Sequence, residues 1–446
     1  MEDYRRIADR IAAEIAAGRP GPGERLPPQR QFARRHGIAA STAGRVYGEL
    51  VRRGLVVGEV GRGTFVRASP MPSGQALAEP ATTAPVNLEL NYPSAPGQPE
   101  LLAAGLAPLL RPDVLAEATR PAPAVGTPAA REAAAGLLAT GGWRPAPDRL
   151  LFAGNARQAV AGALAALVRP GGRVGVEWLT YPLVKDIAAR LGAVLVPLAM
   201  DEQGLRPDAL AAAHRSTPLS AVYVQPTLHN PTSVTMGPAR RRRLADTVRD
   251  LRLPVVEDRI WSFLCGPDGG EPLAARAPER TYVVDGLSKR VAPGLTVGFL
   301  VVPEGHGEET AAALRSGGWT AGRFALEAAV RWIGDGTVAR LVEAKRADAG
   351  ARQRLVARHL DGFAVRSDPR AYYAWWRLPR PWRADVFAAA AARRGIAVTP
   401  GPAFAAGGRG ADGAAPDCVR LGLASAAPPE LERALRTLAA VARAHP

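Results

Sequence analysis

Residues 285–298 read DGLSKRVAPGLTVG, and they place Lys289 between an apolar run at 282–284 and a turn rich in glycine and proline. The chain has only three lysines, Lys185, Lys289 and Lys345, among 57 basic residues, so arginine supplies nearly every generic positive charge. A lysine in such a sequence is a candidate for chemistry that needs a primary amine. At the base of a cleft, burial and neighbouring positive charge would favour the neutral amine that attacks an aldehyde.

Two other interpretations apply to these lysines. The segment around Lys289 fits an exposed lysine in a turn equally well. Lys185 and Lys345 lie in charged, helical surroundings, which are typical of a solvent-exposed helix face.

The composition indicates several folded units. The 446-residue chain is 47% hydrophobic and 22% charged, which favours two or three packed domains over disorder. Its net charge of +16 indicates a polyanionic partner. The two cysteines, Cys265 and Cys418, argue against a disulfide framework. The sequence has no apolar run long enough to span a bilayer, no signal-peptide pattern and no metal-ligand spacing of its six histidines. We therefore expect a soluble cytoplasmic, nucleoid-associated protein without a metal or a membrane partner.

The basic excess is concentrated in residues 1–67, which hold 13 arginines and 7 acidic residues. Helical spacing and turn residues predict three helices there, and alternating apolar residues around Gly58 and 61–63 predict a hairpin. The first helix would bury Ile7, Ile11 and Ile15, the second would cover 29–36, and the third would run to Arg53 and bury Val46, Leu50 and Val51. Three helices and a two-stranded wing form a winged helix-turn-helix.

A winged helix binds double-stranded DNA through its second motif helix and its wing. Arginine can contact guanine or phosphate, and serine or threonine can reach phosphates or base edges. Ser41 and Thr42 can also cap or open the third helix. The side chains that we expect to face DNA are Arg30, Ser41, Thr42, Arg45 and Arg62. Each of them could instead be an ordinary surface residue of an arginine-rich protein.

Residues 68–86 are rich in proline, alanine, serine and threonine and are expected to form a linker. From 87 to 337, short apolar runs alternate with helical segments, which predicts a mostly parallel sheet covered on both faces. Residues 338–446 are expected to form a smaller α+β unit.

Several polar residues follow the predicted strands, where open α/β sheets bind ligands. The pair Glu257-Asp258 places a carboxylate that could hold a pyridinium nitrogen protonated, Asn230 could donate to a ring oxygen, and Tyr181 could stack on a flat ring. Gly154, Asn155 and Ala156 open a helix whose free amide groups suit a phosphate.

Two family resemblances rest on these motifs. The strings GERLPPQR at 23–30, GI at 37–38, ST at 41–42 and GRGTFV at 61–66 closely resemble the GntR-type winged helix. The motifs GNARQA, EWLTYP, PTLHNPT, VVEDRIWSFL, LSKRVAPGLTVGFL and VRLGLA resemble the type I aminotransferase fold, which binds pyridoxal 5′-phosphate. A chain with both parts resembles the MocR-type transcriptional regulators.

The resemblance implies specific roles. Lys289, beside Ser288, matches the lysine that forms a Schiff base with pyridoxal 5′-phosphate; Asp258 matches the pyridinium partner, Asn230 the O3′ donor and Tyr181 the stacking ring. Arg420 matches the arginine that binds the carboxylate of a substrate or effector. Type I folds are typically homodimers, so two winged helices would read paired half-sites.

The sequence departs from both families. Ala40 and Gly44 stand where GntR-type relatives often have base-reading arginines. Thr296 replaces an arginine that helps hold the cofactor phosphate, and Ile260 and Trp261 lack the usual phenol. Arg290 or Arg157 would have to substitute, or the cofactor would bind more loosely.

Three functions fit these features. The first is a transcriptional regulator that senses pyridoxal phosphate or an amino compound, and the second is a working aminotransferase that carries a DNA-binding domain. The third is a DNA-binding protein whose C-terminal part has lost the cofactor and only dimerises.

Overall fold

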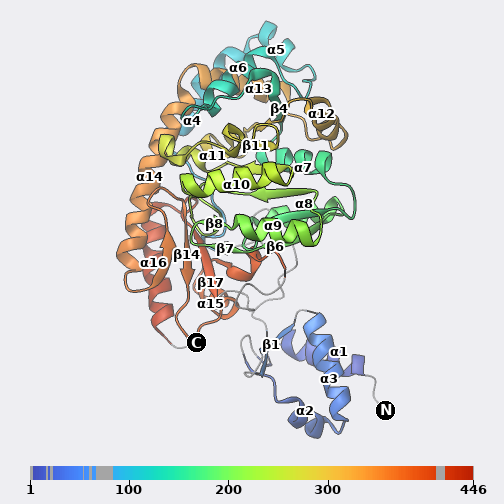
Figure 1. The fold of residues 1–446 in the computed structure, drawn as a ribbon. Coiled ribbons are helices and arrows are strands. Elements are labelled where there is room, and N and C mark those ends of the chain that lie inside the picture. The colour runs from blue at the N-terminus through green and yellow to red at the C-terminus, as the bar shows by residue number, and fades with distance from the viewer. Residues whose placement is uncertain are drawn as a thin grey trace.

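The computed structural model describes residues 4–16, 19–20, 24–53, 55–59, 63–66, 84–407 and 417–444. Figure 1 shows a small N-terminal unit, in blue, beside the C-terminal part of a much larger α/β body. Residues 68–83 of the predicted linker lie outside the described residues, as does Arg62 of the predicted wing. None of the helices in these ranges is both long and apolar enough to cross a membrane.

The N-terminal unit has the predicted helices and wing. Its elements are α1 (Tyr4–Ala16), α2 (Gln29–His36), α3 (Ala40–Arg52), β1 (Val56–Glu59) and β2 (Gly63–Val66). The two strands pair antiparallel, with Val56 opposite Val66. Ile7, Ile11, Val46 and Leu50 are buried in one core. The prediction of a winged helix is therefore confirmed.

Two details of α3 differ from the prediction. Val51 is 45% exposed, and Ala43 and Tyr47 pack in the core instead, because positions 43, 46, 47 and 50 follow the helical repeat more closely. Ser41 and Thr42 lie inside the first turn, while Ala39 is the N-cap and provides no side-chain hydrogen bond. The two hydroxyl side chains therefore do not cap the helix.

The body is built on a seven-stranded sheet with the order β4-β12-β11-β10-β9-β5-β6. All strands run parallel except β12, which is antiparallel to both neighbours. The strands are β4 (Leu150–Ala153), β5 (Arg173–Glu177), β6 (Val194–Leu198), β9 (Ala221–Val224), β10 (Val255–Asp258), β11 (Thr281–Gly286) and β12 (Gly298–Val301). The predicted mostly parallel sheet is confirmed.

Both faces of this sheet are covered. On β9, Tyr223 belongs to the larger apolar cluster, while Val222 and Val224 belong to a second cluster on the opposite face. Helix α7 (Ala156–Leu167) packs in the larger cluster, and α9 (Pro207–Ser216) and α10 (Pro238–Asp250) pack in the second. Burial on both faces explains why the strands read as nearly continuous apolar runs.

Additional helices surround the larger cluster, and short elements connect them. The α-helices are α4 (Gln98–Leu106), α5 (Pro112–Ala118), α6 (Pro128–Leu138), α8 (Pro182–Arg190), α11 (Leu287–Arg290), α12 (Gly307–Ser316) and α13 (Arg323–Gly334). The short strands are β7 (Met200–Asp201) and β8 (Gly204–Leu205), and the 3-10 turns are η1 (Ala107–Leu110), η2 (Pro147–Arg149), η3 (Ser262–Leu264), η4 (Gly266–Gly269), η5 (Leu273–Ala275) and η6 (Gly401–Phe404).

A second sheet, with the order β13-β14-β17-β16, lies in the C-terminal part. It and its neighbours comprise α14 (Thr337–His359), β13 (Ala364–Ser367), β14 (Tyr373–Arg377), α15 (Ala384–Ala392), β15 (Ile396–Ala397), β16 (Thr399–Pro400), β17 (Cys418–Gly422) and α16 (Pro428–Arg443). The first described segment after the linker also packs here, because β3 (Val86–Asn87) pairs with β15 and Leu88 joins the C-terminal apolar cluster. This pairing brings residues 88–92 next to the C-terminal ends of the large sheet.

The expectation that Lys345 lies on an exposed helix face is wrong. Its side chain is 0% exposed, and its Nζ donates to the carbonyl oxygens of Lys289, Arg290 and Val291 at 3.2, 3.0 and 2.7 Å; burial lowers the pKa of this lysine to about 7, and the three acceptors favour the ammonium form. Lys185 is partly buried as well and donates to the carbonyl oxygens of Ala403 and Ala405. At these two positions the lysine amine therefore meets backbone acceptors instead of bulk water.

Candidate functional site

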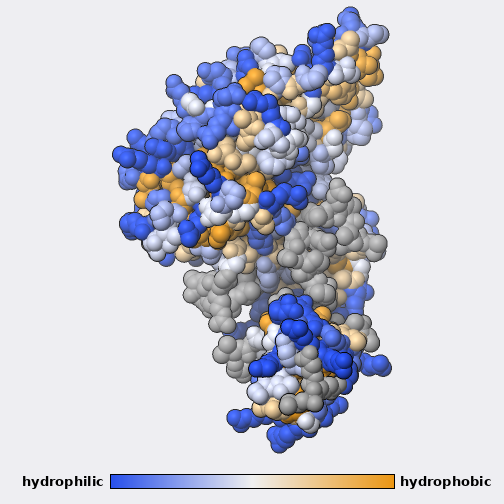
Figure 2. Space-filling view, turned by 90° about the vertical axis from the view of Figure 1, so that its right-hand side faces the viewer, coloured by the Kyte–Doolittle hydropathy of each residue, from blue (hydrophilic) through white to orange (hydrophobic). Residues whose placement is uncertain are grey.

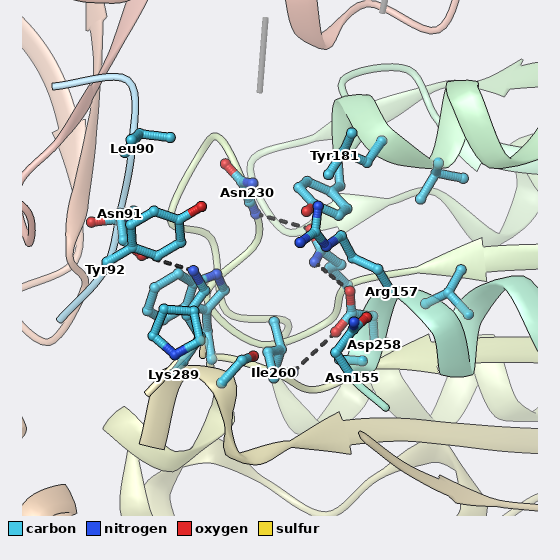
Figure 3. A pocket seen from close by; sticks show the side chains of 18 of the residues that line it. Leu90, Asn91, Tyr92, Asn155, Arg157, Tyr181, Asn230, Asp258, Ile260 and Lys289 are labelled. Atoms are coloured by element: carbon cyan, nitrogen blue, oxygen red, sulfur yellow. Dashed lines mark hydrogen bonds between the residues drawn. The ribbon is translucent and has the colours of Figure 1, made fainter. Parts of the chain in front are cut away.

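One pocket gathers most of the residues that the sequence singled out. It lies where β5, β9, β10 and β11 end, and it has about 980 Å³ of empty space including its opening to solvent. The predicted residues that line it are Asn155, Ala156, Tyr181, Asn230, Asp258, Ser288, Lys289 and Arg420. Figure 3 shows how most of them converge from different elements. Gly154 is not among the lining residues.

Lys289 follows β11 on the short helix α11, and its side chain enters the pocket (Figure 3). Its Nζ donates to the carbonyl oxygen of Asn91 at 2.8 Å and lies 4.6 Å from the ring centroid of Tyr92 and 5.2 Å from that of Trp261. Burial, with the positive charges of neighbouring arginines and Lys345, lowers the pKa of Lys289 to about 7. Near neutral pH, much of this amine is therefore unprotonated.

Asp258 is the last residue of β10 and is 5% exposed. One carboxylate oxygen accepts hydrogen bonds from the hydroxyl of Tyr223 at 2.7 Å and from the amide of Gln225 at 2.9 Å, and the other accepts from the backbone N–H of Ile260 at 3.0 Å. Burial raises the pKa of Asp258, and these three donors oppose the rise. The second oxygen accepts only one of these bonds, which leaves it room for one more donor.

The side chain of the neighbouring Glu257 lies outside this pocket. Successive side chains of a strand point to opposite faces, and Glu257 accepts from Arg259 at 3.1 Å and from the backbone N–H of Leu273 at 2.6 Å. It does not line the pocket. Of the two adjacent acids, only Asp258 is available to a ligand there.

Arg420 and Asn230 meet on one side of the pocket, although 190 residues separate them in the chain. Arg420 is 3% exposed and donates to the Asn230 side-chain oxygen at 3.3 Å and to the backbone oxygen of Glu89. Within the described residues, its Nε has no hydrogen-bond partner. Burial lowers the pKa of Arg420 to about 10, but the guanidinium stays positively charged near neutral pH. It therefore has a free donor for an anionic ligand group.

The N-terminus of α7 provides amide groups to the same pocket. Asn155 is the N-cap and accepts from the backbone N–H of Gln158 at 3.0 Å. The amide groups of Ala156 and Arg157 stand in the first turn, where a helix offers no internal acceptor. Gly298 lets β12 approach this turn, because a Cβ there would lie 2.3 Å from the Asn155 carbonyl oxygen.

Gly154 does not contribute an amide to this helix end. Its N–H donates to the carbonyl oxygen of Trp319 at 3.0 Å, and a Cβ at this position would lie 2.4 Å from Oε1 of Gln158. The side chain of Gln158 thus packs directly over this glycine. The predicted role of its N–H in binding a phosphate does not fit this hydrogen bond.

The structure distinguishes between the two arginines that could compensate for Thr296. Arg290 is buried and forms a two-point ion pair with Asp285, and it does not line the pocket. Arg157 lines the pocket from the first turn of α7 and lowers the pKa of Lys289 through its charge. Thr296 also lines the pocket, and its buried hydroxyl has no partner within the described residues. Arg157 and Thr296 are thus the available side chains near this helix end.

The predicted stacking ring and the two positions that lack the usual phenol all line the pocket. Tyr181 precedes α8 and lies in the pocket (Figure 3), where burial raises the pKa of its phenol. Ile260 and Trp261 form part of the wall, and neither offers a hydroxyl group. Tyr223 does not replace the missing phenol, because it does not line the pocket.

Sequence reasoning missed the segment 89–92, which supplies Glu89, Leu90, Asn91 and Tyr92 to the pocket. An asparagine and a tyrosine directly before a proline, just after the linker, were the only local signal. The segment reaches the pocket through the β3–β15 pairing, which no local pattern reveals.

Pyridoxal 5′-phosphate carries a phosphate, a ring nitrogen and an aldehyde, and the pocket offers a group for each. The unpartnered hydroxyl of Thr296, the first-turn amides of α7 and the exposed Arg157 suit a phosphate. Asp258 can accept from a pyridinium N–H, and Lys289 offers an amine for the aldehyde. The chemistry of this donor set therefore fits the group.

The predicted DNA-facing residues lie on one motif in the N-terminal unit. Arg30, Ser41 and Arg45 are exposed, and Thr42 is partly buried. Ala40 is also exposed, so the short side chains at 40 and 44 leave Arg45 as the longest side chain in the first two turns of α3. Figure 2 shows hydrophilic side chains over much of this unit.

A winged helix joined to an aminotransferase-type body defines the class of this protein. The profile of the family "Aminotransferase class I and II" matches residues 117–438, and the profile "Bacterial regulatory proteins, gntR family" matches residues 3–66. The chain therefore belongs to the aminotransferase class I and II family and carries a GntR-type winged helix. This combination is the MocR-type architecture that the motifs predicted.

Among curated relatives, the "Uncharacterized HTH-type transcriptional regulator YdeF" of Bacillus subtilis is 28% identical over 404 residues, which cover 91% of this chain and 87% of that protein. The "HTH-type pyridoxine biosynthesis transcriptional regulator PdxR" of Corynebacterium glutamicum is 25% identical over 302 residues, or 67% of this chain and 65% of that protein.

Solved aminotransferases have the same fold. An archaeal alanine:glyoxylate aminotransferase matches with a TM-score of 0.73 at 20% identity, covering 81% of this chain and 91% of its own. The α-aminoadipate aminotransferase LysN of Thermus thermophilus matches with a TM-score of 0.70 at 21% identity, covering 80% and 92%. The predicted type I fold of the body is confirmed.

Proposed function

We propose that this protein is a transcriptional regulator that binds DNA through its winged helix and holds pyridoxal 5′-phosphate in the pocket around Lys289, where it senses the cofactor or an amino compound. The observation that carries the proposal is the pocket itself, since Lys289, Asp258, Arg420 and the N-terminus of α7 face one cavity. The YdeF and PdxR relatives, both named as transcriptional regulators, support the regulatory part.

Each residue would have a definite task. The α7 amides, Arg157, Thr296 and Ser288 would bind the phosphate, and Asp258 would accept the ring N–H and keep it protonated. Tyr181 would support the ring face, and Asn230 would hydrogen-bond the ring oxygen. The lowered pKa of Lys289 supplies the neutral amine for the aldehyde. Bound pyridoxal phosphate supplies an electrophilic aldehyde and an electron-withdrawing ring.

Regulation requires that the ligand favours one arrangement of the DNA-binding units over another. We propose a homodimer, in which two winged helices bind paired half-sites of double-stranded DNA. Large apolar side chains that remain exposed on the single chain, such as Leu110 at 65% exposed and Val125 at 39%, support association of two copies.

The test is Lys289→Ala in the full-length chain. Purified wild-type protein with added pyridoxal phosphate should show the visible absorption band of a lysine-bound cofactor, and the variant should lose this band completely. Both proteins should still bind DNA, because the winged helix has its own apolar core. A wild-type protein without the band would overturn the cofactor part of the proposal.

A working aminotransferase is a second candidate, because a pKa of about 7 would also let Lys289 take a proton from Cα of an amino compound and return it. Spectral conversion of the bound cofactor to its amine form by a panel of amino acids would favour this candidate. A stable spectrum with ligand-dependent DNA binding would favour sensing alone.

A further inference from the structure

The pocket contains one carboxylate that the proposed cofactor does not use. Among its lining residues only Asp258 and Glu89 carry carboxylates, and Asp258 already accepts three hydrogen bonds. Within the described residues, no hydrogen bond or ion pair engages the carboxylate of Glu89, whose side chain is partly buried. Only its backbone takes part in the site, since its carbonyl oxygen accepts from Arg420.

Glu89 and Arg420 influence each other without forming an ion pair. The charge of Arg420 opposes the effect of burial, which raises the pKa of Glu89. The guanidinium is engaged with Asn230, the Glu89 carbonyl oxygen and, at 3.5 Å, the hydroxyl of Thr399. Its buried Nε remains without a partner in the described part of the chain. The pocket therefore presents a free cationic donor and a free anionic acceptor close to each other.

The aromatic walls of the pocket favour positive charge as well. Tyr92 and Trp261 lie 4.6 and 5.2 Å from the amine nitrogen of Lys289, within the range of a cation–π interaction. Tyr92 belongs to the same segment as Glu89. Glu89, Tyr92 and Trp261 thus line the same pocket, and each can interact favourably with the ammonium group of a ligand.

We propose that the effector of this pocket is a diamino carboxylic acid, whose carboxylate binds Arg420 and whose distal ammonium binds Glu89. This inference rests on the proposed function, because it names the class of amino compound that the same site senses. A dicarboxylic amino acid would place its second carboxylate near Glu89 and would be repelled, and an apolar amino acid would leave Glu89 without a partner.

The test compares ornithine, norvaline and glutamate, which share a five-carbon chain and differ in the charge at its end. Calorimetric titration of the full-length protein, loaded with pyridoxal phosphate, gives the three affinities. We expect ornithine to bind about tenfold more tightly than norvaline, as one charge-assisted contact provides, and glutamate to bind most weakly. Glu89→Gln should bring ornithine and norvaline to similar affinities, and Glu89→Lys should make glutamate the preferred ligand.

Glu100→Gln serves as the matched control, because Glu100 is exposed on α4 and does not line the pocket. It should keep the wild-type order of affinities. Equal affinities for the three ligands would overturn the inference, and so would an order of affinities that Glu89→Gln leaves unchanged. In either case a visible cofactor band would still support the proposed function. A protein that lacks the band would overturn the proposed function first.

Discussion

The winged helix and the pocket both depend on positively charged side chains, but they hold them in opposite environments. Arg30 and Arg45 are exposed on the winged helix, whereas Lys289 and Arg420 are enclosed by the body and burial lowers the pKa of each. Exposed arginines stay charged and interact with DNA phosphates in competition with salt. The protonation of enclosed cations depends on neighbouring charges and on pH. DNA binding should therefore depend mainly on salt, and ligand binding mainly on the local structure of the pocket.

The largest expected effect is on stability, at a cation that neither DNA nor a ligand contacts. Lys345→Met would leave three buried carbonyl oxygens of residues 289–291 without their donor. Unsatisfied buried acceptors cost about 1–3 kcal/mol each, in part relieved by rearrangement, so we expect the free energy of unfolding to fall by about 2–4 kcal/mol. Denaturant titration followed by circular dichroism measures this change.

Arg354→Met on the same helix is the control for Lys345. Arg354 is exposed, so its replacement should change the free energy of unfolding by less than about 0.5 kcal/mol. Equal effects of the two substitutions would mean that the buried ammonium does not stabilise the turn that carries Lys289.

The second prediction concerns the phosphate end of the pocket. Arg157→Gln removes the exposed guanidinium beside the first turn of α7. Affinity for pyridoxal phosphate should fall about tenfold, the value of one charge-assisted contact, while affinity for pyridoxal, which lacks the phosphate, should change little. Fluorescence titration with both compounds measures the difference.

Arg190→Gln is the matched control for this experiment, because Arg190 is exposed at the end of α8 but does not line the pocket around Lys289. If both variants weaken pyridoxal phosphate equally, the arginines act only through general charge. In that case another group would have to replace the phosphate-binding arginine that is missing at Thr296.

These two sites illustrate what the sequence could and could not predict. The helix at 29–36 follows from local periodicity, and the placement of Asp258 at the end of β10 and of Asn230 in the loop after β9 follows from the rule that ligands bind where parallel strands end. The choice between Arg157 and Arg290 depended on the ion pair of Arg290 with Asp285, which becomes visible only in three dimensions.

The sequence-based predictions failed at places where segments that are distant in the sequence pack together. The charged neighbours of Lys345 indicated an exposed face, but α14 packs against the turn after Lys289, and the lysine is enclosed there. Glu89 and Tyr92 were not predicted as pocket residues, because the pairing of β3 with β15 joins segments more than 300 residues apart. Hydrophobic periodicity carries no information on such contacts.

The third prediction concerns the exposed arginines of the winged helix. Arg30→Ala should weaken binding to all DNA sequences by a similar, few-fold factor, and the slope of log affinity against log salt should fall by about 1. Arg315→Ala, an exposed arginine of the body on α12, should leave the slope unchanged. Fluorescence anisotropy at several salt concentrations measures both. An unchanged slope for Arg30→Ala would place the DNA-binding surface elsewhere.

The smallest expected effect is a dependence on pH. It should appear in cofactor binding by the pocket and be absent from DNA binding by the winged helix. Only the neutral amine of Lys289 attacks an aldehyde, so the rate at which the cofactor-free protein binds pyridoxal phosphate should rise with pH and level off above the lysine pKa of about 7. Removing a neighbouring positive charge, as in Arg157→Gln, should raise the midpoint slightly, because that charge opposes protonation of Lys289. DNA binding should not follow this curve, since arginine keeps its charge throughout the range. A midpoint near 10.5, the ordinary value for lysine, would mean that solvent reaches the amine freely.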